Sequence, residues 1–471
     1  MDDLRICFMP ALEMRDAIKS KMLSPVEVME DVLRNIDRVN LKVNAYCTIT
    51  IENANAEARR AEDMIMKGED LGALHGIPVS IKDLIFTKDI RTTGGTAMYK
   101  DFVPDVDAIV VERLKAAGAI LIGKTNTSQS GWVAITDNLL FGPTRNPWNT
   151  ERTSGGSSGG AASAVASFMG PLAVGSDGGG SIRIPSSFCG VFGFKPSFGR
   201  VPTGPGFPEL WEGLATIGPI TRTVSDAALM MEVISGRDDR DHFSLSDMGL
   251  QYLPHLNEDL KGMRVAWSKD LGYAIVDPQV LKVTEAAIKT FAALGCTVEE
   301  AGPQVGSTEE TFTTVVAASI AASLVEKLDE WGDHFEPALV KFLQKSKDIK
   351  ATEYIKARFA HLKYWRAIQV FFEKYDLLIT PTVAVPPFEV GIYGPREIAG
   401  EKVTSLGWMP FTYPFNITGQ PAASVPCGWT EDGLPVGLQI VGRRFDDTTV
   451  LRACAAFEHA SPWADKIPPI V

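Results

Sequence analysis

The cysteines of this chain are few and widely spaced. Six occur in 471 residues, and no two of them form a CxxC pair. Closely spaced cysteines are typical of zinc sites, redox motifs and the disulfide frameworks of small secreted domains. The spacing therefore predicts reduced, mostly buried thiols in a cytoplasmic protein, with no metal site.

The sequence also lacks long runs of one character. Lysine and arginine form no run and the net charge is −12, which disfavours nucleic-acid binding. No uninterrupted apolar stretch approaches the roughly 18 residues of a membrane span. The N-terminus begins acidic and its apolar run breaks at Pro10, so it makes a poor signal peptide. We expect a soluble, intracellular protein without a membrane partner.

Glycine and serine, by contrast, are concentrated between residues 153 and 196. Ser154 to Gly160 predicts a flexible turn, and Ala161 to Phe168 a small, apolar helix. Pro171 to Gly175 predicts a short buried strand, and Asp177 to Ser181 a second glycine-rich turn. Because a helix and a strand that fold back on each other separate the two turns, we expect the turns to lie close together.

The second turn has the composition of an oxyanion hole. Gly178, Gly179 and Gly180 lack Cβ atoms, so their backbone N–H groups can converge on one oxygen, and Ser181 beside them is the candidate nucleophile. A nucleophilic serine needs a base, and no histidine is near. Lys82 follows the apolar strand pattern of residues 77 to 81, where burial lowers the pKa of a lysine and lets it act as a base.

Six motifs in this order resemble the amidase signature family, and stand-alone bacterial amidases most of all. The motifs are HGIPVSIKD, GKTN, NPWN, GGSSGG, GSDGGGSIR and FGFKP, and the resemblance extends from about Leu23 to about Trp463. It implies a catalytic triad in which Lys82 is the base, Ser157 the serine next to a cis peptide bond, and Ser181 the nucleophile. The sequence departs from the family at Gly178, where many members have threonine or isoleucine.

The same resemblance implies acyl transfer to water. Neutral Lys82 takes a proton from Ser157, and Ser157 takes one from Ser181 as its Oγ attacks the amide carbon. The N–H groups of Gly178, Gly179 and Gly180 stabilise the oxyanion, and water then hydrolyses the acyl-Ser181 ester. The mechanism requires no metal and no organic cofactor.

Other residues are expected to support this chemistry. Ser158 is expected to support the triad without reacting. Asp177 and Arg183 flank the oxyanion hole, and an ion pair that fixes the turn is their expected role. The loop after the motifs contains Phe207, Leu210 and Trp211, which either line a substrate pocket or pack among themselves at the surface.

The fold is expected to be α/β, with a large mixed β-sheet covered by helices on both faces. We expect one domain over residues 1–471, with an N-terminal helical region at 1–70. Residues 309–374 are predicted to form a helical insertion beside the active site, or a plain helical cover on the sheet. The expected partner is a small-molecule amide, and a homodimer is possible.

Three functions of different kinds follow. The first is an amidohydrolase that cleaves a linear carboxylic amide, an aryl amide, an ester or a carbamate. The second is the glutaminase subunit of a tRNA-dependent amidotransferase, which uses the same triad. The apolar loop around Trp211 and the helical insertion suit an apolar substrate better than glutamine.

The third function is nucleotide binding, because Gly118 to Thr125 matches the Walker A pattern. A phosphate loop needs a helix after it, whereas here a strand carries the motif and a loop follows. Gly156 to Gly160 likewise matches the G-x-S-x-G nucleophile elbow, but no strand is expected before it. The element order disfavours both interpretations.

Overall fold

The computed structural model describes residues 6–69, 71–207, 210–211, 213–246 and 249–471. Eleven strands form one sheet in the order β1-β3-β2-β4-β6-β5-β12-β13-β9-β7-β8. Their bounds are Tyr46–Ile49 (β1), Pro78–Lys82 (β2), Ile120–Thr125 (β3), Leu172–Asp177 (β4), Phe192–Lys195 (β5), Thr216–Thr221 (β6), Arg264–Trp267 (β7), Thr297–Glu300 (β8), Leu377–Pro381 (β9), Ala422–Trp429 (β12) and Pro435–Gly442 (β13). A separate hairpin pairs Glu397–Ile398 (β10) with Glu401–Lys402 (β11).

The sheet is mixed, and its parallel part positions the site. β2 pairs in parallel with both β3 and β4, whereas β4, β6, β5, β12, β13 and β9 pair antiparallel in turn. Because the carboxyl ends of parallel strands meet at one edge of a sheet, Lys82 at the end of β2 comes close to Ser176 and Asp177 at the end of β4.

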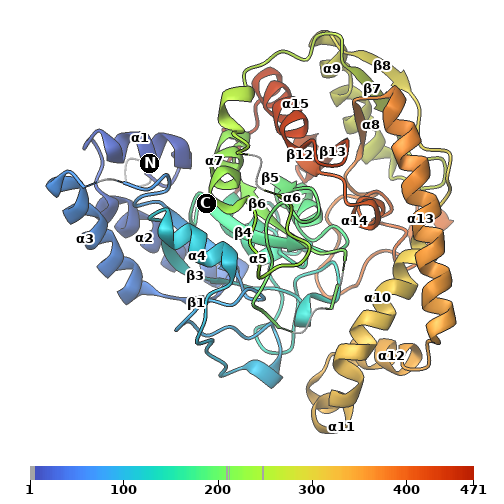
Figure 1. The fold of residues 1–471 in the computed structure, drawn as a ribbon, viewed down its shortest axis with the longest axis horizontal. Coiled ribbons are helices and arrows are strands. Elements are labelled where there is room, and N and C mark those ends of the chain that lie inside the picture. The colour runs from blue at the N-terminus through green and yellow to red at the C-terminus, as the bar shows by residue number, and fades with distance from the viewer. Residues whose placement is uncertain (1–5, 70, 208–209, 212, 247–248) are drawn as a thin grey trace.

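Helices cover both faces of the sheet (Figure 1). Their bounds are Ala11–Lys19 (α1), Pro25–Val43 (α2), Ile51–Lys67 (α3), Ile109–Ala116 (α4), Gly159–Ala166 (α5), Arg183–Cys189 (α6), Val224–Ile234 (α7), Pro278–Ala287 (α8), Lys289–Ala293 (α9), Glu309–Leu324 (α10), Leu328–Trp331 (α11), Pro337–Ser346 (α12), Ala351–Lys374 (α13), Pro414–Thr418 (α14) and Asp447–Ala460 (α15).

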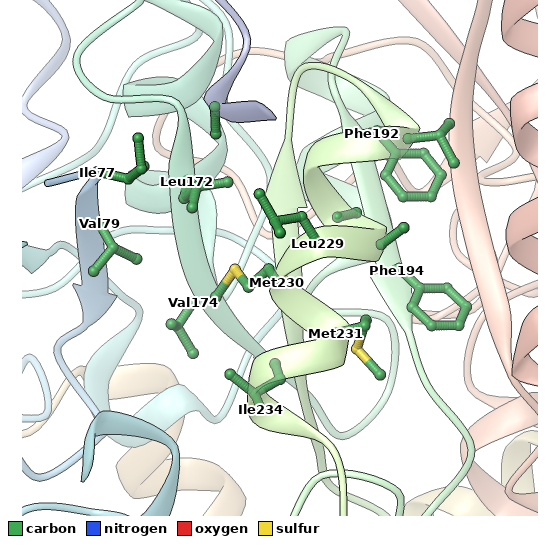
Figure 2. Close-up of a cluster of buried hydrophobic side chains, with 14 of the residues drawn as sticks. Ile77, Val79, Leu172, Val174, Phe192, Phe194, Leu229, Met230, Met231 and Ile234 are labelled. Carbon is green, nitrogen blue, oxygen red and sulfur yellow. The ribbon is translucent and has the colours of Figure 1, made fainter. Parts of the chain in front are cut away.

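Alternation along the strands sends apolar side chains to two different helices. Figure 2 shows the face covered by α7, where Val79 of β2, Val174 of β4 and Phe194 of β5 belong to one buried cluster with Met230 of the helix. Ala173, the neighbour of Val174, belongs instead to the cluster of small side chains around α5. Since successive side chains of a strand point to opposite faces, this pattern confirms the predicted α/β fold.

The two ends of the molecule carry different helical layers. Helices α1, α2 and α3 lie at one end, and α10, α11, α12 and α13 lie at the other (Figure 1). A capping box begins α2: the Ser24 Oγ accepts the Val26 N–H at 2.9 Å, and the Glu27 carboxylate accepts the Ser24 N–H at 3.0 Å.

Two strands lie where the sequence pattern predicted none. The N-terminal region expected to be helical also contains β1, which is only four residues long and pairs with the edge of β3. Strand β6 lies in the Pro/Gly-rich stretch expected to be a loop, and Pro219 sits inside it opposite Val174. Proline is rare within a sheet because it lacks an N–H donor, so local composition pointed away from this strand.

One helical run, Glu309–His334, is long and apolar enough by composition to cross a membrane; it is the only such run in the described part of the chain. One face of α10 within it packs into the core through Phe312, Val316, Ile320 and Leu324. One such run is weak evidence for a membrane span, because the core helices of soluble proteins pass the same test of length and composition.

Candidate active site

Lys82 lies at the end of β2 and is wholly buried. Its Nζ donates to the Ser157 Oγ at 2.7 Å, to the Ser176 Oγ at 3.0 Å and to the Ser176 carbonyl at 3.3 Å. Burial lowers the pKa of Lys82 to about 7, and the negative charge of Asp177 offsets only part of this effect. A large fraction of the lysine is therefore neutral near pH 7 and able to accept a proton.

Ser157 lies in the first glycine-serine turn, and the peptide bond between Gly156 and Ser157 is cis. The turn is tightly enclosed, because a Cβ on Gly156 would approach the Ile135 carbonyl carbon to 2.3 Å. Thr136 donates its Oγ1 proton to the Ser157 carbonyl at 3.2 Å. These contacts fix the backbone of the turn while the Ser157 Oγ accepts from Lys82.

Ser158 connects the first turn to the second. Its N–H donates to the Ser181 carbonyl at 3.2 Å, and its Oγ donates to the Ser176 carbonyl at 3.2 Å. The hydroxyl thus points at the end of β4. This is a supporting arrangement, and it brings the two turns together as the sequence pattern predicts.

The second turn presents free backbone donors. Among the residues that the structure describes, the N–H groups of Gly178, Gly179 and Ser181 have no hydrogen-bond acceptor. The Gly180 N–H donates to the Asp177 Oδ1 at 2.7 Å. The Asp177 carboxylate thus occupies the Gly180 N–H, whereas the Gly178, Gly179 and Ser181 donors face no acceptor among the described residues.

Asp177 and Arg183 form a buried two-point ion pair across the base of this turn. The Arg183 Nε donates to the Asp177 Oδ2 at 3.0 Å, and its Nη2 donates to the Asp177 Oδ1 at 2.9 Å. Burial alone would raise the pKa of Asp177, but the Arg183 charge holds it well below its usual range. The pair braces the turn and touches none of the three candidate triad side chains.

Asn416 of α14 completes this brace. Its Nδ2 donates to the Asp177 carbonyl at 2.8 Å and to the Asp177 Oδ1 at 2.9 Å, and its Oδ1 accepts from Arg183 at 2.6 Å. The remaining Arg183 donor, Nη1, reaches the Thr412 carbonyl and Gln439. The C-terminal part of the chain thereby holds the glycine turn in place.

A cavity of about 260 Å³ opens at Ser181 and Gly179. Aromatic side chains from distant parts of the sequence line it: Trp132, Trp211, Phe312, Phe342, Tyr393 and Trp408. Arg396 is the only charged residue among the described lining residues. Such a cavity favours an apolar or aromatic group over a charged one.

The absence of a side chain at Gly178 leaves room for the Trp211 indole in the wall of the Ser181 cavity. A Cβ at Gly178 would lie 2.7 Å from the Trp211 Cδ2, which is closer than side-chain packing allows. The absence of a side chain at this departure from the family pattern lets the indole pack directly on the turn.

The three residues predicted to line a pocket lie along one cavity. All three line a cavity of about 180 Å³ beside the Ser181 cavity, and Trp211 lines the Ser181 cavity as well. Phe207 packs edge-on against Phe86 at a centroid distance of 4.9 Å. Phe207 and Leu210 therefore line the cavity that also contains Ser176, and Trp211 lies between this cavity and the one at Ser181.

Helical residues of the insertion also reach the site. Phe312 of α10 and Phe342 of α12 line the Ser181 cavity. Glu336, just before α12, is buried, and its Oε2 accepts from Trp132 at 3.3 Å and from Tyr393 at 2.9 Å. Burial raises the pKa of Glu336 to about 7.

Sequence reasoning missed Ser176, Asn416 and Glu336. Ser176 stands inside the motif GSDGGGSIR, so its position beside the candidate nucleophile was a usable signal. Asn416 and Glu336 carry no local signal, because their partners are distant in the sequence. Asn416 is 239 residues from Asp177, and Glu336 is 204 residues from Trp132.

The two disfavoured motif matches form neither of the features that they resemble. Lys124 is a fully buried residue of β3, and its Nζ donates to the Ile85 carbonyl, to Thr87 at 2.8 Å and to Thr92 at 3.1 Å. It therefore has no position from which to hold a phosphate. No strand directly precedes the Gly156–Gly160 turn in the described chain, so it lacks the geometry of a nucleophile elbow.

A buried lysine with a depressed pKa, two serine-bearing turns and free backbone donors meet at one edge of the large mixed sheet, and groups of these kinds can activate a serine and bind an oxyanion. The sequence model of the Amidase family matches residues 27–451, and the chain belongs to this family.

Individual relatives agree with this placement. The chain is 39% identical over 473 residues to an acylamidase of Rhodococcus erythropolis, covering 99% of this chain and 98% of that protein. It superposes on a bacterial aryl acylamidase of the amidase signature enzymes with a TM-score of 0.92 at 34% identity, covering 97% of each chain. It is also 35% identical over 484 residues to the A-subunit of the glutamyl-tRNA(Gln) amidotransferase from a Sulfurihydrogenibium species, covering 97% of this chain and 98% of that protein. The protein is an amide-hydrolysing enzyme, as the resemblance implied.

Proposed function

We propose that the enzyme hydrolyses linear amides bearing an apolar or aromatic group through an acyl-Ser181 intermediate. The observation that carries the proposal is the 2.7 Å hydrogen bond between the Ser157 Oγ and a wholly buried Lys82, in the turn next to the one that contains Ser181. Esters and carbamates contain the same carbonyl centre and belong to the same substrate class.

The reaction proceeds in two balanced halves. Neutral Lys82 takes the hydroxyl proton of Ser157, Ser157 takes that of Ser181, and the Ser181 Oγ forms a bond to the amide carbon. The N–H groups of Gly178, Gly179 and Ser181 stabilise the oxyanion, at about 2.7–4 kcal/mol for one such donor. The relay returns a proton to the leaving amine as the C–N bond breaks, and water then cleaves the acyl ester to release the acid and regenerate Ser181.

A fluorophosphonate reagent and a panel of aryl amides test the proposal. We expect one equivalent of label on the peptide that contains Ser181, and turnover of aryl amides that stops in proportion to labelling. Turnover that continues in fully labelled protein, or label on another serine, would contradict the acyl-Ser181 intermediate.

The alternative function is that of the glutaminase component of a tRNA-dependent amidotransferase, which the amidotransferase relatives support. The aromatic cavity argues against it. Free glutamine carries both a carboxylate and an ammonium group, and Arg396, the one charged residue of the described lining, could pair only with the carboxylate. Glutamine hydrolysis far faster than aryl-amide hydrolysis would reverse this preference.

We also propose that the chain is a single domain acting in the cytoplasm on small molecules, without a nucleic-acid or membrane partner. One continuous sheet through the whole chain supports the single domain. Gel filtration with light scattering distinguishes a monomer from the predicted possible homodimer, and one cooperative melting transition is expected for a single domain.

A further inference from the structure

A third cavity, of about 390 Å³, lies between α13 and the end of α14. It shares no described lining residue with the Ser181 cavity or with the neighbouring cavity around Phe207. Asn416, which braces Asp177 on one side, forms part of its wall on the other. The third cavity therefore lies behind the glycine turn and is separate from the place where the amide substrate binds.

Two arginines give the third cavity a positive charge. Arg358 of α13 and Arg444, which follows β13, both line it, and no aspartate or glutamate is among its described lining residues. Within the described ranges, neither arginine makes an ion pair or a hydrogen bond with another residue. This is unusual in a chain with 58 acidic and 46 basic residues, where carboxylates are in excess.

The charge of Arg444 is also partly desolvated. Its Nε is buried and has no hydrogen-bond acceptor among the described residues. Burial lowers the pKa of Arg444, and no carboxylate offsets this effect. Buried polar groups in proteins are normally hydrogen-bonded, so the Arg444 Nε is a donor that an anion in the cavity could satisfy.

Histidine does not supply further charge here. Burial, together with the Arg358 charge, lowers the pKa of His361 to about 4. His361 is therefore neutral at pH 7, and the described wall of the third cavity presents two cations and no anion.

The rest of the wall is aromatic. Phe198, Phe243, Tyr354 and Trp365 line the same space as the two arginines. Flat apolar rings favour a planar, apolar body, and a guanidinium fork matches a planar carboxylate in two-point geometry. We propose that the third cavity is a binding site for an aromatic monocarboxylate, held by Arg358 and Arg444 through its carboxylate and by the four rings through its body.

Titration calorimetry with benzoate tests this proposal on the full chain at low ionic strength. Benzyl alcohol serves as the uncharged probe with the same ring, and inorganic phosphate as the anion without a ring. The variants are Arg358→Gln and Arg444→Gln. Arg366→Gln is the matched control, because Arg366 is an exposed residue two turns further along α13 and is not part of the cavity.

We expect benzoate to bind the wild type and the Arg366→Gln control equally, and to bind each cavity variant at least about ten-fold more weakly, as the loss of one charge-assisted hydrogen bond implies. Benzyl alcohol should not distinguish the variants. Benzoate that occupies only the Ser181 cavity would bind Arg358→Gln and Arg444→Gln as it binds the wild type, and this result would overturn the proposal. Phosphate binding as tight as benzoate binding would overturn it too, because it would remove the role of the rings.

A folding defect is separated from a binding defect by thermal melting. Arg444→Gln removes a partly buried charge that makes no ion pair or hydrogen bond with the described residues and whose guanidinium lies 4.4 Å from the centre of the Phe445 ring. The melting temperature of this variant should therefore stay close to that of the wild type. If Arg358→Gln does not fold, Arg358→Lys keeps the charge and loses the planar fork. It should still bind benzoate more weakly than the wild type, and unchanged affinity in this variant would refute the two-point contact.

Discussion

Replacing Lys82 by arginine or by methionine separates the proton that this side chain moves from the space that it fills. Both variants retain a long unbranched stem in the buried site, but a guanidinium does not lose its proton in a protein and a thioether has none to exchange. If Lys82 is the base, Lys82→Arg and Lys82→Met should therefore be damaged to a similar degree.

The magnitude follows from burial. With a pKa of about 7 in place of 10.5, about half of the Lys82 side chains are neutral at pH 7, compared with about 0.03% of unperturbed lysines. Burial thus raises the concentration of the basic form about a thousandfold. Loss of a general base alone costs about 10²–10⁴-fold, and Ser157 also loses the partner that sets its proton. We expect kcat/KM to fall by more than about 10⁴-fold, which corresponds to more than about 5 kcal/mol of transition-state stabilisation.

The assay is the pH profile of kcat/KM for a chromogenic aryl amide, because this quantity reports the pKa of a group in the free enzyme. Activity should rise through about pH 7 and stay high into the alkaline range. Substantial activity in Lys82→Arg, with a limb that follows any of the six histidines, would refute the reasoning. A limb above about pH 9 would refute the depressed pKa.

The same shift has a consequence for stability. Because the folded pKa of Lys82 is depressed, the unfolded chain binds more protons between about pH 7 and 10.5, and wild-type stability from this group rises with pH across that window. Lys82→Met lacks this rise. The melting temperature of Lys82→Met relative to wild type should therefore be highest at or below pH 7 and should decline towards pH 10.

Three further changes test the neighbouring groups. Ser181→Ala should abolish both fluorophosphonate labelling and turnover, whereas Ser158→Ala should keep the label on Ser181 and lose only part of kcat; labelling lost in Ser158→Ala alone would reverse the two roles. Gly178→Ala should push the Trp211 indole off the turn and raise KM for aryl amides several-fold, and in a Trp211→Ala background Gly178→Ala should leave KM unchanged. Because the pKa of Glu336 is raised to about 7, its contribution to wild-type stability falls as pH rises from about 4.5 through about 7. Glu336→Gln lacks this loss, so the variant should melt at a higher temperature than the wild type at pH 8 and at the same temperature at pH 4. A lower melting temperature at pH 8 would show that the ionised carboxylate stabilises the aromatic wall.

Local pattern was enough to predict the elements that carry the chemistry. Alternating apolar residues before Lys82 indicated a buried strand, and a lysine at the end of such a strand has a depressed pKa for reasons of desolvation alone. Runs of glycine and serine are typical of turns, so both turns and the helix and strand between them could be predicted from composition, although α5 already begins at Gly159. The order of the motifs led to the family, which the match to the Amidase family confirms, and to the α/β fold.

Tertiary structure alone decided which groups are free to act. The Gly180 N–H is taken by Asp177, and Asn416, Arg183 and Gln439 hold that aspartate in a network that joins strands and helices more than 200 residues apart. Strand β6 accommodates Pro219 within the sheet, where it pairs with β4 on one side and β5 on the other. Hydrogen-bond partners and cavity walls are set by pairings between distant segments, and no short stretch of sequence contains the partner as well as the group.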